Sequence, residues 1–324
     1  MKTFPRFLSR QTGRFFSPER LFKINTPCFL PFYHVVSNEK LPHILNYPYR
    51  NVQEFENELD FFLKHFEPVS LEELVSGECR QKKPFHLSFD DGLRECLDVV
   101  APLLLKKGIP ATFFINTAFT DNKELFHKYK ASLILSELRQ KPDSTVEDFL
   151  KKAKLPAEKL LTATILQTGT LNHAANLMDL DFKAFLEKQK PYLTSSQIKE
   201  LTRAGFTIGA HSHNHPEFYT LAEEEQMQEV KASMAFLQKI TTQPIKTFAF
   251  PYTDWGVPAK VLKTIQEENI CDITFGTAGI KNDTFSFHFQ RYPAEQPGNF
   301  VQNLKGEFVY YKLRKWVGKA TVKH

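Results

Sequence analysis

Two short segments of the chain hold the residues whose types and spacing are best suited to chemistry. Asp90 and Asp91 are adjacent carboxylates at the end of an apolar run, and His211 and His215 lie four residues apart in a later segment. Histidines at positions i and i+4 face the same side of a helical turn, so both could reach one ion. One carboxylate and two imidazoles make a three-ligand metal site with open positions, which is typical of hydrolytic sites. The second carboxylate would remain available as a base.

Each segment also has a simpler interpretation. An Asp-Asp-Gly sequence is at home in a solvated turn, and a single pair of histidines is often found on the surface or in the core without a metal. The metal interpretation is favoured because both segments directly follow apolar, strand-like runs and supply complementary ligands. This donor set suits a borderline ion, with Zn²⁺ preferred and Co²⁺ or Ni²⁺ as alternatives.

The elements around these residues alternate between strands and helices. Short apolar runs predict strands over residues 27–36, 85–89, 111–115, 206–210, 246–250, 272–275 and 285–292. Helical spacing of apolar residues predicts helices over residues 52–66, 93–107, 195–204, 221–240 and 257–269. This alternation indicates right-handed βαβ units. Asp90, His211 and Tyr252 each follow a predicted strand, so in a parallel barrel they would meet at one face.

Residues 120–190 differ from the rest of the chain. This stretch is rich in Lys, Leu, Glu and Ala and carries almost no strand signal. We therefore expect several helices there, inserted between two strand–helix units of the barrel.

Composition is that of a globular protein, with 324 residues, 42% hydrophobic and 24% charged. The four cysteines (Cys28, Cys79, Cys96 and Cys271) have neither zinc-site nor redox-pair spacing, so we expect free thiols in a reducing compartment. No apolar stretch of signal-peptide or membrane-spanning length is found near the N-terminus. The sequence therefore predicts a cytoplasmic location.

Positive charge is concentrated at the two ends. Residues 1–23 and 305–324 each hold six Lys or Arg and one acid, so each end has a net charge of +5. Since the whole chain has a net charge of +5, residues 24–304 have a net charge of −5. A mildly acidic body argues against a nucleic-acid binder. The segment 308–317 interleaves aromatic and basic residues, which suits peripheral contact with an anionic membrane, although a terminal helix packed on the domain has the same pattern.

Four segments together resemble one known family. They are residues 85–92 (FHLSFDDG), 107–114 (KGIPATFF), 205–215 (GFTIGAHSHNH) and 248–252 (FAFPY). In this order they resemble the polysaccharide deacetylases (carbohydrate esterase family 4), from about Leu30 to Pro293. The resemblance implies a distorted (β/α) barrel of about seven strands and metal-dependent removal of acetyl groups from sugars. We expect a basic N-terminal extension (1–26), the barrel with its insertion (27–304) and a basic aromatic tail (305–324).

The resemblance also implies roles for individual residues. Asp91, His211 and His215 match the metal ligands of the family, and Asp90 matches its catalytic base. The backbone N–H of Tyr252 matches a group that stabilises the oxyanion.

The chain departs from the family pattern in two places. Many relatives carry an Arg, which orients the base, where this chain has Ala249, and Arg291 could serve instead. The general acid of the family is a late histidine between apolar residues, and His288 is the candidate, with a packing role as the alternative. His34 could line the pocket, Trp255 could form an apolar floor for the acetyl methyl group or simply pack, and His213 would point away from the metal.

The leading hypothesis is a hydrolase that removes acetyl groups, by cleaving C–N bonds, from an N-acetylated sugar or glycan. A cytoplasmic chain with a membrane-seeking tail would meet lipid-linked glycan intermediates. Two alternatives remain. One is a catalytically weak glycan-binding module, suggested by the missing Arg and by the poor match of His288 to the general acid of the family. The other is an amidase or esterase acting on a non-carbohydrate substrate, suggested by the insertion.

Overall fold

The computed structural model describes residues 4–77 and 83–324. Within them, eight strands form one parallel sheet in the order β10-β8-β7-β6-β5-β4-β1-β11. The strands are β1 (Pro31–Tyr33), β4 (Leu87–Phe89), β5 (Ala111–Ile115), β6 (Thr207–Ala210), β7 (Thr247–Ala249), β8 (Ile273–Gly276), β10 (His288–Gln290) and β11 (Tyr292–Pro293).

The sheet is nearly closed into a barrel. The edge strands β10 and β11 are separated in sequence by Arg291 alone, so the chain passes directly from one edge of the sheet to the other. The predicted (β/α) barrel is therefore confirmed. It has eight strands rather than about seven, because the apolar run 285–292 holds parts of two strands on either side of Arg291.

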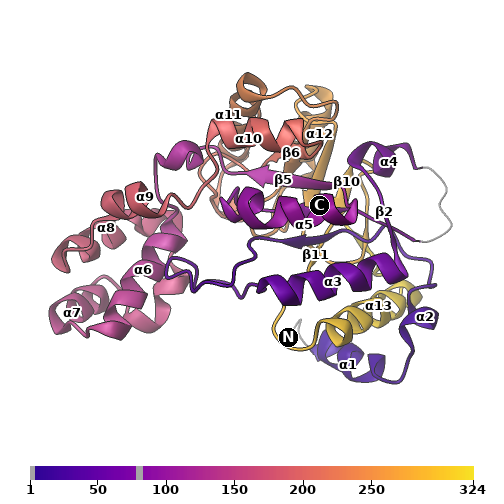
Figure 1. The fold of residues 1–324 in the computed structure, drawn as a ribbon, viewed down its shortest axis with the longest axis horizontal. Coiled ribbons are helices and arrows are strands. Elements are labelled where there is room, and N and C mark those ends of the chain that lie inside the picture. Colours follow the sequence, from indigo (N-terminus) through magenta and orange to yellow (C-terminus); the bar gives the residue numbers. More distant parts are fainter. Residues whose placement is uncertain (1–3, 78–82) are drawn as a thin grey trace.

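Helices cover the barrel on its outer faces. Figure 1 shows α10, α11 and α12 above the strands, α5 between β5 and β11 in this view, and α3, α13 and α1 below. The bounds are α3 (Val52–His65), α5 (Ala101–Lys107), α10 (Ser195–Arg203), α11 (Glu223–Ile240), α12 (Ala259–Glu267) and α13 (Phe300–Trp316). The predicted helix over 93–107 is present only from the π-helical turn η1 (Cys96–Val100) onward, where it continues into α5.

Helix α3 illustrates how the sequence forms these elements. Asn51 accepts a hydrogen bond from the Glu54 N–H, and the Glu54 side chain accepts one from the Asn51 N–H, which closes a capping box. Phe55, Leu59 and Phe62 then recur on one face and are fully buried. Burial of each such side chain contributes about 1.5–3 kcal/mol.

The shorter elements lie around this framework. They are α2 (Pro18–Leu21), β2 (Glu67–Pro68), α4 (Leu71–Ser76), β3 (Pro84–Phe85), η5 (Phe218–Thr220), β9 (Asn282–Asp283) and β12 (Thr321–Val322). Strand β9 pairs with β12, and this pairing brings residues 321–322 back to the barrel.

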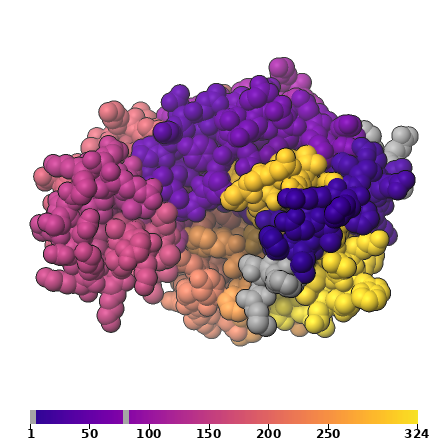
Figure 2. Space-filling model, turned by 90° about the horizontal axis from the view of Figure 1, so that it is seen from below, coloured from indigo at the N-terminus to yellow at the C-terminus, as the bar shows by residue number. Residues whose placement is uncertain are grey.

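The predicted helical insertion is confirmed and forms a lobe at one end of the molecule (Figures 1 and 2). It comprises η2 (Thr120–Asn122), α6 (His127–Gln140), α7 (Ser144–Lys152), η3 (Ala157–Thr162), η4 (Ile165–Gln167), α8 (Thr168–Leu177) and α9 (Phe182–Gln189). The lobe has its own buried cluster, which includes Ile134, Leu150 and Leu171. Its helices therefore stabilise one another, while α6 and α9 also pack against barrel residues such as Val35 and Leu93.

The two ends of the chain pack together rather than forming separate tails. Helix α1 (Phe4–Gly13) lies against α13, as Figure 2 shows. A side chain at Gly306 would lie 2.6–3.1 Å from atoms of Arg10, so the close approach requires glycine there. Arg6 also donates to the buried carboxylate of Glu307 at 3.3 Å. The boundary predicted between residues 304 and 305 falls inside α13.

The cysteines and the hydropathy of the helices bear on two expectations from the sequence. Cys28, Cys96 and Cys271 are free, as expected, whereas Cys79 lies outside the described residues. Along the part of the chain that is described, no helix combines the length and the apolar character needed to cross a membrane.

Candidate active site

A cavity of about 370 Å³ opens at the carboxyl ends of the barrel strands. Because all eight strands are parallel, the residues that follow them collect at this end. His34 follows β1, Asp90 and Asp91 follow β4, and His211 follows β6. The lining is completed by residues of neighbouring loops and the insertion, namely Phe32, Asn46, Tyr47, Phe126, Lys128, Leu161, His215, Tyr252 and Thr277.

Asp91, His211 and His215 converge as the sequence predicts. Oδ1 of Asp91 lies 3.2 Å from Nε2 of His215 and 3.8 Å from Nε2 of His211. All three side chains are buried, and one ligand atom from each lies within 4.8 Å of the others. Three buried ligands of this type at this spacing form a candidate metal centre.

The environment of these atoms fits a cation. Nδ1 of His211 lies 2.8 Å from the Ala249 carbonyl oxygen, which can only accept, so Nδ1 carries the proton and Nε2 is left with its lone pair toward the carboxylates. Oδ1 of Asp91 is buried and accepts no well-formed hydrogen bond. A buried carboxylate oxygen without a partner is costly, and a metal ion would satisfy it.

The histidines do not converge in the way that the sequence suggests. Residues 211–215 form a loop rather than a helical turn, and both Ser212 (φ 69°) and His215 (φ 56°) lie in the left-handed region. Asp91 (φ 72°) and Tyr252 (φ 54°) share this conformation. Positive φ values at four non-glycine residues of one site indicate local strain, which clusters at functional sites. The helical-turn argument from spacing i, i+4 was therefore wrong in its geometry.

Arg291 takes the place of the Arg that relatives carry at Ala249. Its guanidinium donates to both carboxylate oxygens of Asp90, at 2.6 and 2.8 Å, and to Ser88 Oγ at 3.0 Å. Burial alone would raise the pKa of Asp90, but the charge and hydrogen bonds of Arg291, together with His211 and His34, lower the pKa below its usual value. Asp90 is therefore ionised at neutral pH and held in one orientation.

The same guanidinium fills the barrel interior. It lies over the ring of Phe32 at 4.4 Å and also over the rings of Phe114 and Phe275, and Arg291 is only 1% exposed. These contacts are cation–π interactions, which stabilise a buried charge.

His288 is not part of this group. It is buried, with Nδ1 2.7 Å from Thr274 Oγ1 and Nε2 3.2 Å from Asp254 Oδ2, and it does not line the cavity. The general-acid role predicted for His288 therefore has no geometric support. Its place in β10 directs the side chain to a different side of the barrel wall, behind Phe250.

His34 is a third histidine of the cavity lining, outside the metal-ligand group. Its Nδ1 lies 2.7 Å from Oε2 of Glu295, a residue just after β11. Burial alone would lower the pKa of His34, but the Glu295 carboxylate, with further contributions from Asp91 and Asp90, raises it to about 9. His34 thus carries a proton at neutral pH and can act as an acid. The only sequence signal for this role was its position at a strand end.

Tyr252 lies at the cavity wall, where its ring packs against His215 with centroids 4.5 Å apart. Its hydroxyl lies 3.3 Å from Nε2 of His127. Among the described residues we find no acceptor for the Tyr252 backbone N–H. This donor is therefore available for an oxyanion.

The insertion also contributes to the site, which the sequence did not reveal. Tyr129 belongs to α6, and its hydroxyl lies 3.2 Å from Oδ2 of Asp91. The hydroxyl of Tyr47, from the loop before α3, lies at the same distance from this oxygen and 2.7 Å from the Tyr129 hydroxyl. They leave Oδ1 facing the histidines. Phe126 covers His215, with ring centroids 4.6 Å apart. Nothing in the local sequence of residues 120–190 indicates that its first helix touches a barrel ligand.

Two further residues lie outside the cavity. His213 turns away from the metal-ligand group, with Nδ1 2.8 Å from Thr117 Oγ1, as expected. Trp255 is 65% exposed and does not line the cavity, so it forms no floor under an acetyl methyl group. Its ring packs against that of Tyr219, with centroids 5.8 Å apart, as the alternative expected.

Comparison with known proteins agrees with this geometry. Residues 77–270 match the model of the polysaccharide deacetylase family. The chain belongs to the polysaccharide deacetylase family. Comparison with curated proteins gave no significant match.

Solved structures of deacetylases share the fold. The Streptococcus pyogenes deacetylase PplD, in complex with acetate, has 17% identity and a TM-score of 0.57, over 86% of this chain and 97% of that chain. IcaB from Ammonifex degensii has 15% identity and a TM-score of 0.57, over 87% and 98%. A de-N-acetylase from Aggregatibacter actinomycetemcomitans has 13% identity and a TM-score of 0.55, over 86% and 98%. At these identities the likeness establishes the barrel fold.

Proposed function

We propose that this polysaccharide deacetylase family member is a metal-dependent hydrolase that removes the acetyl group from an N-acetylated sugar. One observation carries the proposal. The ligand group Asp91, His211 and His215, the ionised carboxylate of Asp90 and the protonated imidazole of His34 line the same cavity. These are the groups that amide hydrolysis requires: a Lewis-acid site, a base and an acid.

The roles follow from the positions of the groups. A divalent ion held by Asp91, His211 and His215 would polarise the acetyl carbonyl and lower the pKa of water. Asp90, oriented by Arg291, accepts a proton from the attacking water. The Tyr252 N–H donates to the oxyanion. His34, held by Glu295, donates its proton to the departing amine nitrogen.

The glycan-binding alternative loses one of its two supports. It was suggested by the absent Arg at position 249 and by the poor match of His288 to a general acid. Arg291 forms a bidentate pair with Asp90 from another strand junction. His288 lies outside the cavity, so the enzyme proposal depends on His34 as the acid. The non-carbohydrate alternative keeps one supporting observation. Phe126, Lys128 and Leu161 of the insertion line the cavity and narrow the range of substrates that fit.

The test is acetate release from chito-oligosaccharides and from lipid-linked amino sugars, alongside a panel of other acetyl esters and amides. We expect turnover on an N-acetylated sugar that chelator abolishes and added Zn²⁺ or Co²⁺ restores. Asp91→Asn should lose both metal and activity, whereas Asp98→Asn, on the exterior, should lose neither. Full turnover in the presence of chelator, or in Asp91→Asn, would contradict the proposal.

A lipid-linked substrate is favoured by exposed residues just after α1 and at the end of α13. They are Phe15 (88%), Trp316 (86%) and Val317, together with the bases Arg14 and Lys315. Exposed aromatics beside basic residues suit the headgroup region of an anionic bilayer. We therefore expect peripheral binding to vesicles containing phosphatidylserine. Co-sedimentation that persists unchanged in the variant Phe15→Ser/Trp316→Ser would contradict this docking mode.

A further inference from the structure

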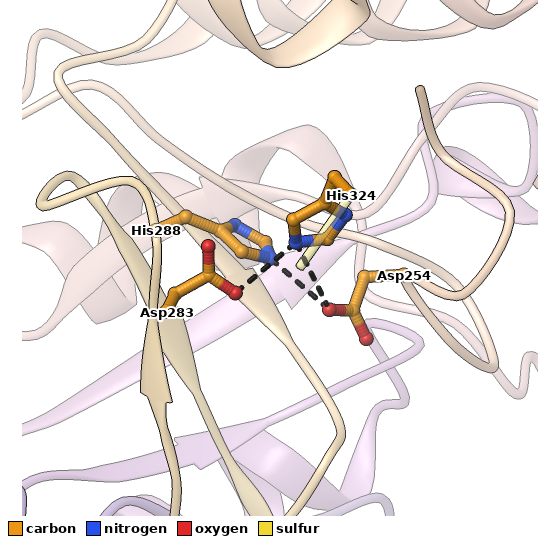
Figure 3. Close-up of side chains that lie close together, drawn as sticks. All are labelled: Asp254, Asp283, His288 and His324. Carbon is orange, nitrogen blue, oxygen red and sulfur yellow. Dashed lines mark hydrogen bonds and ion pairs between the residues drawn. The ribbon is translucent and has the colours of Figure 1, made fainter. Parts of the chain in front are cut away.

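A second group of metal-ligating side chains lies outside the active site, as Figure 3 shows. Each of four residues offers one ligand atom, and these atoms all lie within 4.8 Å of one another. The four come from separate segments: Asp254 from the loop after β7, Asp283 from β9, His288 from β10, and His324 from the residues after β12. None of them lines the cavity that holds Asp90.

The spacing of the ligand atoms matches a tetrahedral ion. Nε2 of His288 lies 3.2 Å from Oδ2 of Asp254, and Nε2 of His324 lies 3.1 Å from Oδ2 of Asp283 and 3.9 Å from Oδ2 of Asp254. A tetrahedral Zn²⁺ with bonds of about 2.0–2.1 Å separates its ligand atoms by about 3.3 Å. Small side-chain shifts would therefore bring all four atoms to bonding distance.

Both imidazoles are held with Nε2 toward the carboxylates. Nδ1 of His324 lies 3.3 Å from the Val257 carbonyl oxygen, which can only accept, so Nδ1 donates. Nδ1 of His288 lies 2.7 Å from Thr274 Oγ1, a hydroxyl that can accept in the same way. A histidine whose Nδ1–H is bound to an outer acceptor presents the Nε2 lone pair to a metal, which is the usual support of a ligand histidine.

The carboxylates are also fixed from outside the group. Gln290 Oε1 accepts from the Ala278 N–H at 2.7 Å, so its amide nitrogen donates to Oδ2 of Asp254 at 2.6 Å and to Oδ2 of Asp283 at 2.9 Å. Each carboxylate oxygen keeps a second lone pair for an ion. A Cβ at Gly276 would lie 2.4 Å from the Asp254 carboxylate, so this close packing requires glycine.

We propose that Asp254, Asp283, His288 and His324 form a closed, four-coordinate structural site for Zn²⁺. Their side chains are no more than 4% exposed, which leaves no position for a substrate. Two carboxylates balance the charge of a divalent ion. The ion joins residue His324 to the barrel wall and to the loop that starts at Tyr252. A cross-link of this kind lowers the conformational entropy of the unfolded chain and so stabilises the fold.

The test is the zinc content of the full-length protein after equilibration with Zn²⁺ and removal of unbound metal. We expect about two Zn²⁺ per chain in the wild type, about one in His324→Ala, about one in Asp91→Asn and none in the double variant. Asp283→Asn, which preserves side-chain volume, should match His324→Ala. His173→Ala, an exposed histidine of the insertion, is the matched control and should keep both ions.

Cobalt substitution gives an independent readout of geometry. In Asp91→Asn loaded with Co²⁺ we expect the visible absorption of a tetrahedral ion, which His324→Ala in the same background should abolish. Circular dichroism confirms that each variant is folded. Zinc content that falls in Asp91→Asn and is the same in His324→Ala as in the wild type would overturn the proposal. The four residues would then form two metal-free histidine–carboxylate ion pairs.

Discussion

The two groups of histidines and aspartates contain the same types of side chain but differ in their surroundings. The group at Asp91 offers three ligands beside a cavity and has Asp90 and His34 within the same lining. The group at Asp254 offers four ligands, whose side chains are no more than 4% exposed. An open position and neighbouring acid–base groups are what allow chemistry, whereas a full ligand set without them favours a structural role. Ligand type alone does not distinguish the two.

The largest difference in activity should come from substituting one carboxylate at each group, Asp90 at the first and Asp283 at the second. We expect Asp90→Asn to lower kcat by about 10²- to 10⁴-fold, because the base that accepts the proton of water is lost. Its metal content should stay at the wild-type level, since Asp91 is intact. Acetate release and metal analysis on the same samples measure both quantities.

Asp283→Asn is the counterpart and should keep kcat within about twofold while lowering the melting temperature in the presence of Zn²⁺. Full activity in Asp90→Asn, or a loss in Asp283→Asn as large as that in Asp90→Asn, would remove the functional distinction between the groups.

Arg291 should prove as important to the fold as to the base. Arg291→Met leaves the Asp90 carboxylate buried without its partner, which should destabilise the protein by about 3–5 kcal/mol. The loss should be largest at neutral pH, because a carboxyl with a lowered folded pKa contributes stability above its unfolded pKa. Denaturant unfolding measures the loss. Phe114→Leu removes one ring above the guanidinium but keeps the ion pair, so it should cost less.

The Glu295 carboxylate should set the alkaline limit of activity. His34 is protonated below a pKa of about 9, so turnover should fall as the pH rises through about 9. Glu295→Gln removes the charge that raises this pKa and should shift the alkaline limb down by about two pH units. A pH profile of kcat/KM measures the shift.

The pairing of His34 with Glu295 should also be visible in stability. Since the folded pKa is raised, its contribution is complete below about pH 6.5 and is lost as the pH rises through about 9. Glu267→Gln, exposed on α12, is the matched control for both measurements. An unchanged alkaline limb in Glu295→Gln would exclude His34 as the acid.

The smallest effect is expected where the insertion touches the metal-ligand group. Tyr129→Phe removes one of two hydroxyls near Oδ2 of Asp91 and should weaken metal affinity by about tenfold. Competition with a chelator of known affinity measures this change. Tyr49→Phe, which removes a tyrosine hydroxyl bonded to the backbone, should leave the affinity unchanged. Equal affinity in Tyr129→Phe and wild type would show that the insertion does not tune the ligand.

Sequence and structure agree best where the signal is local. The helical spacing of apolar residues predicted the helices, and short apolar runs predicted most strands. Because the strands are parallel, Asp90, His211 and Tyr252, which follow three of them, lie at one edge of the sheet. The sequence by itself therefore determined the barrel, the insertion and the residues at the metal-ligand group. It misjudged the conformation of residues 211–215, because spacing is compatible with both a helical turn and a loop of left-handed residues.

Only the tertiary structure decided which distant residues complete the sites. Glu295 pairs with His34, the proposed acid, Arg291 pairs with Asp90, the proposed base, and Tyr129 reaches Asp91 from the insertion. His288, in turn, belongs to a group assembled with Asp254 and His324. Such contacts join segments far apart in sequence, and they depend on strand order and barrel closure, which local propensity does not encode.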